Sequence, residues 1–598
     1  MGTVYLCIVI FLLCLAVFDL FVGVSNDAVN FLQSAIGAKV AKFRTVLIIA
    51  SFGVVLGAIM SSGMMDIARH GLISPDHFTF EEVMTLFLAV MVTDVIVLDV
   101  FNTFGMPTST TVSLVFELLG GAFILATLKM IGDDSLNYGV LLNSDKALEV
   151  IMGIFSSVII AFVFGIIVMW LSRVVFTFNY RKHSRYSIAI FGGISFTVLS
   201  YFIFMKGLGK SPYLPSEWHD FIDQNIGTLL CATFVISAIV MEFLHLCRIN
   251  IFKLTVLMGT FALAMAFAGN DMVNFIGVPL AGLSSYNDYM ANANGAAPDS
   301  FMMTSLMESA KTTPAYLLAA GFVMIIAMAT SKKAQNVIKT SVDLSRQDEG
   351  DEMFGSSSAA RIIVRSCQSA DSWLNRFLPK SLKQWINKRF DKNDVELEES
   401  AAFDVVRAAV NLVLASMLIT IGTNLKLPLS TTYVTFMVAM GSSLADKAWS
   451  RESAVFRVTG VVIGGWFVTA GVAFIACAIV CLAMHFGGIL VQTVFMALVI
   501  FMLIRSNIQY NKKAKEESKE NTFQLMMRSS DPETVWGFLR YQVSHTQSFI
   551  CRFALDEFNL IMDVAPCQQR TEKGTGHVEE VPPPRDVRLE TFALRNCH

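Results

Sequence analysis

The sequence NDAVNF at residues 26–31 interrupts an apolar run near the start of the chain, and NDMVNF repeats it at residues 270–275. Each copy is followed by a second repeated phrase, PTSTT at residues 107–111 and PLSTT at residues 428–432. Carboxylates, amides and hydroxyls are costly at membrane depth and usually mark a functional pathway there. The duplicated set therefore predicts a solute site that is built from two halves of a transporter.

Composition places the chain in a membrane. Its 598 residues are 54% hydrophobic and have a mean hydropathy of +0.58, too apolar for a soluble protein of this length. Runs of about 20 apolar residues recur along the chain, and each is long enough to cross a roughly 30 Å hydrocarbon core as a helix. The short alternating segments of a β-barrel are absent. We expect an all-α polytopic protein in the lipid bilayer, with no nucleic-acid partner.

The apolar runs predict about 12 to 13 transmembrane helices, some of them discontinuous or re-entrant. Their approximate extents are 3–38 (interrupted), 43–62, 82–103, 107–130, 147–173, 186–206, 226–246, 250–283 (interrupted), 314–331, 401–423, 428–446, 457–484 and 488–506. The expected domains are a first transmembrane repeat (1–225), a linking span (226–249), a second repeat in two parts (250–331 and 401–510), a cytoplasmic insert (332–400) and a cytoplasmic C-terminal tail (511–598).

Basic residues in the short loops indicate the orientation, because such residues prefer the cytoplasm. If the spans alternate, one side of the membrane receives Lys39, Lys42, Arg44, Arg173, Arg181, Lys182, Arg185, Arg248, Lys253, Lys447, Arg451 and Arg457. The N-terminus is then outside, and the insert and the C-terminus are cytoplasmic. The first PTSTT phrase starts at the inner face and the second at the outer face. The halves are therefore expected to be inverted-topology repeats of about six spans each.

The phrases carry suitable groups for a cation and an anion. Asn, Asp and the second Asn of NDxVNF lie on one helix face, where their oxygens can share a hard cation. Nearby glycines and Pro279 are expected to break these spans and expose backbone groups. Pro107 and Pro428 suit the first turn of a helix, so the hydroxyls that follow lie at a helix N-terminus, which favours an anion.

None of the four phrases contains Lys or Arg. A site with two carboxylates and no fixed cation repels an anion unless protons or metal ions arrive with it. Moving a dianion into a negative cell costs about 4.6 kcal/mol at 100 mV, which favours more than one co-transported monovalent cation. Asp99 and Glu117 flank the PTSTT phrase and are candidate ion ligands. For Asp94, Glu242 and His245, a role in ion binding and a role in packing are equally compatible with the sequence.

At these phrases the chain resembles the inorganic phosphate transporter (PiT) family, whose signatures are duplicated GANDVAN and PxSTTH motifs. The resemblance covers roughly residues 20–130 and 265–470. It implies an inverted-repeat symporter in the cell (inner) membrane that imports phosphate with sodium or, in some members, protons, and that has no cofactor. The implied substrate-binding residues are Asn26, Asp27, Asn30, Ser109, Thr110, Thr111, Asn270, Asp271, Asn274, Ser430, Thr431 and Thr432. Among these, the implied sodium ligands are Asn26, Asp27, Asn270 and Asp271. The resemblance leaves open whether the protein forms a homodimer.

The motifs also depart from the family pattern. The histidine after each STT is replaced by Val112 and by Tyr433, which favours sodium over protons because two titratable groups are lost. A sulfate permease of the same fold is the main alternative, although phosphate keeps a proton at neutral pH that Asp27 or Asp271 can accept. An ion channel would show a single filter in a symmetric oligomer. A membrane enzyme would need a nucleophile and a base within reach, so no enzyme is expected.

Overall fold

The computed structural model describes residues 2–104, 108–133, 135–179, 185–201, 216–308, 312–331, 401–446 and 467–527, and also 381, 384, 385, 389 and 390. The chain divides into two compact units, Met1–Ile500 and Phe501–His598. Pro107, most of the expected insert and the tail after residue 527 lie outside the described residues. Within the described part the fold is almost entirely helical, with two isolated β-bridges.

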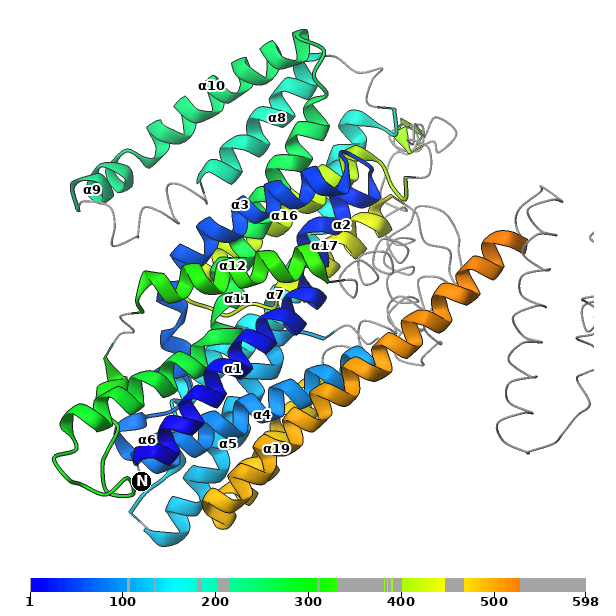
Figure 1. Cartoon of the computed structure of the whole chain (residues 1–598). Coiled ribbons are helices and arrows are strands. Elements are labelled where there is room, and N and C mark those ends of the chain that lie inside the picture. The colour runs from blue at the N-terminus through cyan, green and yellow to red at the C-terminus, as the bar shows by residue number, and fades with distance from the viewer. Residues whose placement is uncertain are drawn as a thin grey trace, which may run out of the picture. The chain divides into compact units, whose positions relative to one another are not determined.

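The helices follow the apolar runs (Figure 1). Their bounds are α1 (Gly2–Asp27), α2 (Val29–Gly37), α3 (Phe43–Met60), α4 (Phe80–Phe104), α5 (Thr110–Gly132), α6 (Tyr138–Leu141), α7 (Ser144–Phe176), α8 (Arg185–Ser200), α9 (Ser216–Gln224), α10 (Ile226–Leu246), α11 (Ile251–Asn292), α12 (Pro314–Thr330), α16 (Val405–Asn424), α17 (Thr431–Ala445) and α19 (Phe467–Met527). Short 3-10 or π turns are η1 (Ser61–Met64), η2 (Ile67–Gly71), η3 (Pro75–His77) and η7 (Thr304–Met307).

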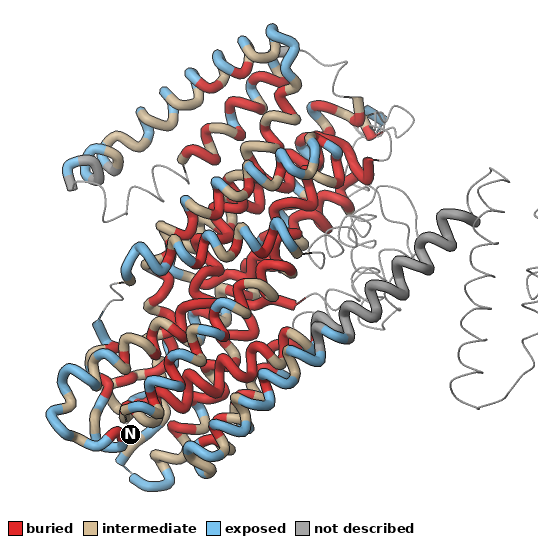
Figure 2. Tube along the Cα trace, in the orientation of Figure 1, coloured by how far each residue is buried: buried red, intermediate tan, exposed pale blue. Residues whose placement is uncertain are grey.

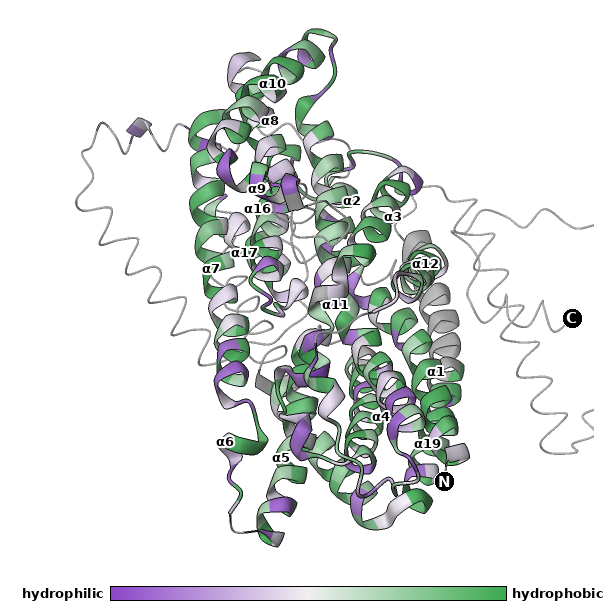
Figure 3. Ribbon diagram, turned by 90° about the vertical axis from the view of Figure 1, so that its left-hand side faces the viewer, coloured by the Kyte–Doolittle hydropathy of each residue, from purple (hydrophilic) through white to green (hydrophobic). Residues whose placement is uncertain are grey.

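Each predicted apolar segment contains helix in the structure. Among the described residues, nine helical segments are long and apolar enough to span a membrane, and α8 and α12 are shorter apolar helices. The predicted spans 457–484 and 488–506 correspond to the two parts of α19, which are separated by non-helical backbone at Gly488 (φ 55°, ψ −151°). Residues 457–466 lie outside the described residues. Figure 3 shows that α7 and α10 are mostly hydrophobic along their lengths, as lipid-facing helices require.

Two expected interruptions turn out differently. The break in 3–38 falls at Ala28, between α1 and α2, but the Ala28 N–H still donates to the Val24 carbonyl (2.9 Å). The break expected in 250–283 is absent, because α11 continues from Ile251 to Asn292 through Pro279. A proline removes one helical hydrogen bond, and here α1, α3, α4 and α16 all pack against α11. Packing by these neighbours holds the helix together past the proline.

Close packing of α3 on α11 explains the glycines of this region. Gly53 and Gly57 lie one helical turn apart on α3 and face the α11 backbone. A Cβ on Gly57 would lie 2.1 Å from the Met265 carbonyl oxygen. Small residues spaced four apart let two membrane helices approach closely. Buried residues accordingly concentrate where α11 meets its neighbours (Figure 2).

This contact gives a stability prediction. Gly57→Ala should lower the free energy of unfolding by about 1–3 kcal/mol, because the added methyl group overpacks the α3–α11 contact. Gly471→Ala is the matched control, since a Cβ there meets nothing within 4 Å, and it should be neutral or stabilise by about 0.5–1 kcal/mol. Unfolding in mixed detergent micelles measures both. Equal effects of the two variants would contradict the close approach.

Two helical hairpins carry the STT phrases. Helices α4 and α5 form the first, and its open end is joined by an ion pair between Lys129 and Glu82 (2.9 Å). Helices α16 and α17 form the second, and its open end is joined by Arg173 of α7, which pairs with Asp446 (2.7 Å) and with Asp404. Each tip therefore lies at the far end of its hairpin from an ion pair.

The two hairpins enter the bundle from opposite ends of α1 and α2. The open end of the first hairpin lies at the start of α1, where the rings of Tyr5 and Phe80 are 4.8 Å apart. The open end of the second lies at the end of α2, where the Ala402 N–H donates to the Gly37 carbonyl (2.8 Å). At 1.5 Å per residue these ends are roughly 50 Å apart along the helices. The tips meet between them, so the STT phrases lie inside the bundle rather than at its faces as the sequence suggested.

Candidate functional site

The two hairpin tips and the two NDxVNF phrases meet in one buried set of side chains, which we call the central cluster. Its members are Asn26, Asp27, Asn30, Thr110, Thr111, Asn270, Asp271, Asn274, Thr431 and Thr432. Asp27 and Asp271 are both fully buried. Two phrases that are each repeated hundreds of residues apart in the sequence predict this grouping.

Each carboxylate receives one threonine hydroxyl from each hairpin. Asp27 accepts from Thr110 (3.1 Å) and from Thr432 (3.0 Å). Asp271 accepts from Thr111 (3.0 Å) and from Thr431. In each STT sequence the first threonine thus donates to the aspartate of its own half, and the second threonine donates to the aspartate of the other half. This crossed pattern links the two halves of the chain at the cluster.

The asparagines repeat the same correspondence. Asn26 donates to the Thr108 carbonyl (3.3 Å), and Asn270 donates to the Leu429 carbonyl (2.7 Å), which occupies the equivalent position in the second phrase. Both asparagines also donate to the carboxylate of the aspartate that follows them. The amides therefore tie each NDxVNF phrase to the backbone of its own hairpin tip.

The second asparagine of each phrase crosses to the opposite hairpin. Asn30 donates to Thr432 (3.0 Å), and Asn274 donates to Thr111 (2.8 Å). The hydrogen bonds of the two halves differ at the side-chain oxygens of these two asparagines. Thr435 donates to Asn30 Oδ1 (3.2 Å), whereas the equivalent residue in the first hairpin is Leu114, which has no hydroxyl. Asn274 Oδ1 is accordingly a buried acceptor without a hydrogen-bond partner.

The serines of the two phrases act as helix caps. Ser109 accepts the Val112 N–H (3.3 Å) at the start of α5, and Ser430 accepts the Tyr433 N–H (3.2 Å) at the start of α17. The first N–H groups of a helix lack partners within it and carry a positive partial charge. Two helix N-termini therefore point into the central cluster, an arrangement that favours an anion.

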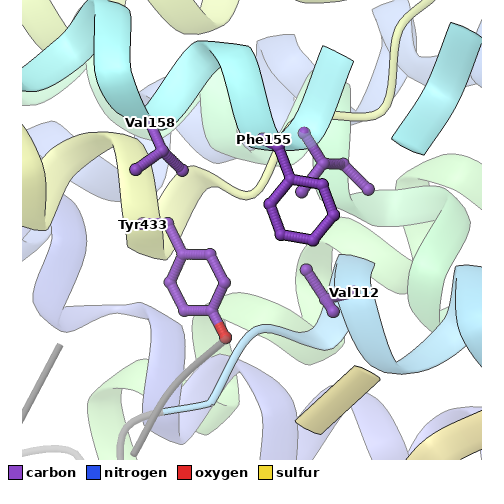
Figure 4. Close-up of a pocket in the computed structure, with 5 residues that line it drawn as sticks. Val112, Phe155, Val158 and Tyr433 are labelled. Atoms are coloured by element: carbon purple, nitrogen blue, oxygen red, sulfur yellow. The ribbon is translucent and has the colours of Figure 1, made fainter. Parts of the chain in front are cut away.

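Val112 and Tyr433, which replace the family histidines, meet beside the cluster. Figure 4 shows them at a small gap against α7, where Phe155 and Val158 complete the labelled lining. The gap is apolar apart from the Tyr433 hydroxyl, which bonds to Thr469 of α19. The two positions thus correspond in space as well as in sequence, and neither brings an imidazole to the cluster.

Basic groups near the hairpin tips are engaged elsewhere. Lys426, at the tip of the second hairpin, is 62% exposed and lies 3.5 Å from Asp66. Arg69, between α3 and α4, donates to Ser284 (3.2 Å), and burial lowers the pKa of its guanidinium from the ordinary value. Among the described hydrogen bonds of the cluster, none comes from a lysine or an arginine. The described donors to its two carboxylates are all neutral.

Two other predicted ion ligands lie on the two helices of the first hairpin. Asp99 is half-buried near the end of α4. Glu117 is fully buried on α5, where it accepts the Ser113 hydroxyl (2.7 Å), and it lies in the electrostatic neighbourhood of Asp94 and Asp19. Sequence patterns did not indicate a role for Asp19 or for Thr435. The only signal for Asp19 was a carboxylate in an apolar run, eight residues before Asp27.

Comparison with known proteins identifies the family. A family model described as the phosphate transporter family matches residues 23–341, which is more than half of the chain. The chain belongs to the phosphate transporter family. The matched region includes both NDxVNF phrases and the first STT phrase, and the second STT phrase follows beyond it. This confirms the resemblance drawn from the motifs.

A solved structure shares the fold of this family member. It is described as "The sodium-dependent phosphate transporter", and the match covers 80% of this chain and 99% of that one, with a TM-score of 0.56 and 15% sequence identity. Comparison with curated protein sequences gave no match. The chain is therefore a multi-pass membrane transporter of all-α fold, and it is not an enzyme.

Proposed function

We propose that this protein imports inorganic phosphate by symport with a cation, and that the cation is sodium. The proposal rests on the crossed hydrogen bonds of Asp27 and Asp271. Two buried carboxylates, four hydroxyls and two helix N-termini meet there without a lysine or an arginine among their described partners. Hydroxyl and N–H donors suit an oxyanion, and the carboxylates require a cation beside it.

The threonine hydroxyls can serve only one acceptor at a time. In this structure Thr110, Thr111, Thr431 and Thr432 donate to the two aspartates. A hydroxyl has a single hydrogen to donate, so it reaches phosphate only after a cation has replaced it at the carboxylate. We therefore infer that cations bind first and that phosphate affinity depends on them.

Asymmetry of the cluster favours one side for a cation. Asn274 Oδ1 is a buried carbonyl oxygen without a donor, and Asn274 also donates to Asp271 (3.1 Å), so both side chains lie together. Hard cations prefer carboxylate and carbonyl oxygens. We assign the first cation to Asp271 and Asn274, where an acceptor is already free. The two halves, joined through this cluster by hairpins from opposite ends, are proposed to be inverted repeats.

The hydroxyls that cross between halves offer a sharp test. Thr111→Val and Thr432→Val each remove a donor to the opposite aspartate and preserve the shape of the side chain. A hydrogen bond to a charged group contributes about 1.5–3 kcal/mol. Apparent phosphate affinity should therefore fall by roughly 10- to 100-fold, at about 1.4 kcal/mol per tenfold change. Kinetics of labelled phosphate uptake measure the change.

Thr127→Val is the matched control for these variants. Thr127 lies on α5, the same helix as Thr111, and its hydroxyl bonds to the Phe123 carbonyl (2.7 Å) and to Tyr138 (3.0 Å). Uptake by this variant should equal that of the wild type. If Thr111→Val and Thr432→Val also leave the affinity unchanged, these hydroxyls do not bind the substrate.

Uptake into proteoliposomes tests the proposed function itself. Labelled phosphate should accumulate inside the vesicles when an inward sodium gradient is imposed. It should not accumulate with a potassium gradient or a proton gradient alone. Arsenate, which has the same shape and protonation, should compete strongly, and sulfate weakly. Uptake driven by protons alone would refute sodium coupling, and preferential uptake of sulfate would refute the substrate.

A further inference from the structure

A second group of buried carboxylates lies one to two helical turns away from the central cluster. It consists of Asp19 on α1, Asp94 on α4 and Glu117 on α5, which are 1%, 2% and 0% exposed. Asp94 lies within hydrogen-bonding reach of Asp19, and Ser113 lies between Asp94 and Glu117. We call these three side chains and Ser113 the second acidic group. It joins α1 to both helices of the first hairpin.

Four of the six carboxylate oxygens in the second acidic group receive no hydrogen bond from a donor. Both oxygens of Asp19, Oδ1 of Asp94 and Oε2 of Glu117 are buried and accept no hydrogen bond. Among the described ion pairs, none involves these carboxylates. An uncompensated buried carboxylate is costly, so such a group needs a positive partner.

Among the described residues, the groups that act on this site supply no positive charge. Cys477 of α19 faces Glu117, and Asp27 is a further carboxylate that acts on Asp19. Among the described residues, no three His, Cys, Asp or Glu side chains converge as ligands of a metal ion would. A multivalent metal centre is therefore not what the geometry offers. The geometry instead suits a single small cation between two carboxyl groups.

We propose that Asp19 and Asp94 hold an exchangeable monovalent cation, a proton or a sodium ion, at a site separate from the central cluster. This inference rests on the proposed cation-coupled transport and adds a further coupling site to it. The cation joins α1 to the first hairpin. Asp19 and Asp27 lie on the same helix, about 12 Å apart along its axis at 1.5 Å per residue. A charge at Asp19 therefore acts on Asp27 through a water-poor interior.

The test counts cations per phosphate in Asp19→Asn and Asp94→Asn. Asparagine keeps the shape of each side chain and removes a charge from a site that lacks donors, so both variants should fold. Proteoliposomes containing the full chain are given labelled sodium and labelled phosphate, and a pH-sensitive dye records proton movement. Asp133→Asn is the control, because Asp133 is exposed and the described hydrogen bonds of its carboxylate all come from nearby Ser135.

Three outcomes are decisive. One sodium ion fewer per phosphate in both variants, with the control unchanged, identifies sodium at the site. One proton fewer, with the sodium count unchanged, identifies a proton. Unchanged counts of both ions overturn the inference. These ratios do not depend on how fast each variant transports.

A second measurement separates this site from the proposed function. Equilibrium binding of labelled sodium to the purified wild-type protein and the two variants needs no phosphate and no transport. A wild-type protein that transports no phosphate would overturn the proposed function. The cation site at the second acidic group would then be tested by the sodium-binding measurement alone. Loss of one bound sodium ion in both variants would support a sodium site. Equal sodium binding by all three proteins would exclude sodium and leave the proton of the transport count as the one cation that the site can hold.

Discussion

We expect cation-dependent phosphate uptake to fall by roughly 100-fold or more in Asp271→Asn, equivalent to about 2.7 kcal/mol at 1.36 kcal/mol per tenfold change. Asp271 accepts hydrogen bonds from Thr111, Thr431, Asn270 and Asn274. Asparagine fits the space but presents an amide to some of these donors and carries no charge for a cation. Initial rates of labelled phosphate uptake into proteoliposomes measure the loss.

The other half of the chain supplies an internal comparison. Asp27→Asn should reduce uptake by a similar factor, because Asp27 also receives one threonine hydroxyl from each hairpin. Asp288→Asn is the control. Asp288 lies on α11 as Asp271 does, but it bonds to Ser305 (2.7 Å) and Asn292 (2.6 Å) away from the cluster. If Asp271→Asn takes up phosphate at the rate of the wild type, these carboxylates are not part of a phosphate site.

Arg173→Met should lower the free energy of unfolding by about 3–5 kcal/mol, the usual cost of breaking a buried ion pair by removing one partner. The Arg173 guanidinium is fully buried, and it joins Asp404 at the start of the second hairpin to Asp446 at its end. Methionine fills a similar volume but removes the guanidinium charge from two buried carboxylates. Unfolding in mixed detergent micelles measures the loss.

The ion pair of the first hairpin is the comparison for Arg173. Lys129 and Glu82 occupy the equivalent place, but their side chains remain 19% and 17% exposed. Water can solvate Glu82 after Lys129→Met, so this variant should lose clearly less stability. Equal losses at the two hairpins would show that burial of the Arg173 pair does not determine its contribution.

Much of the central cluster was predictable because its residues break an apolar pattern twice. Asp27 and Asp271 lie in runs where a carboxylate must find partners, and the repeated order of the phrases indicated which partners. The family match confirms the type of protein that this pattern suggested. The assignment of these side chains to phosphate and sodium stays a proposal.

Other features depend on packing that the sequence pattern does not reveal. Gly269, Gly277 and Pro279 suggested a broken span, but α11 is continuous, since its neighbours pack along it. Ser109 and Ser430 were grouped with the ligands, and the structure uses their oxygens as helix caps. Such roles depend on where a helix begins to within one residue, which periodicity does not resolve.

Asp19 was overlooked because it is not repeated. Its run is as apolar as that of Asp27, but no equivalent phrase in the second half draws attention to it. Only the folded chain brings it to Asp94 and Glu117, which come from a hairpin about 75 to 100 residues further along. A lone buried carboxylate becomes informative when its neighbours from other helices are known.

The central claim is that one oxyanion binds between Asp27 and Asp271. Electron cryo-microscopy of the purified protein in sodium phosphate tests this most directly. Our account predicts density for a tetrahedral anion within hydrogen-bonding distance of the Thr111 and Thr432 hydroxyls, with cation density against the Asp271 carboxylate. Phosphate density at any other place, with the four threonines still donating to the two aspartates, would contradict the account.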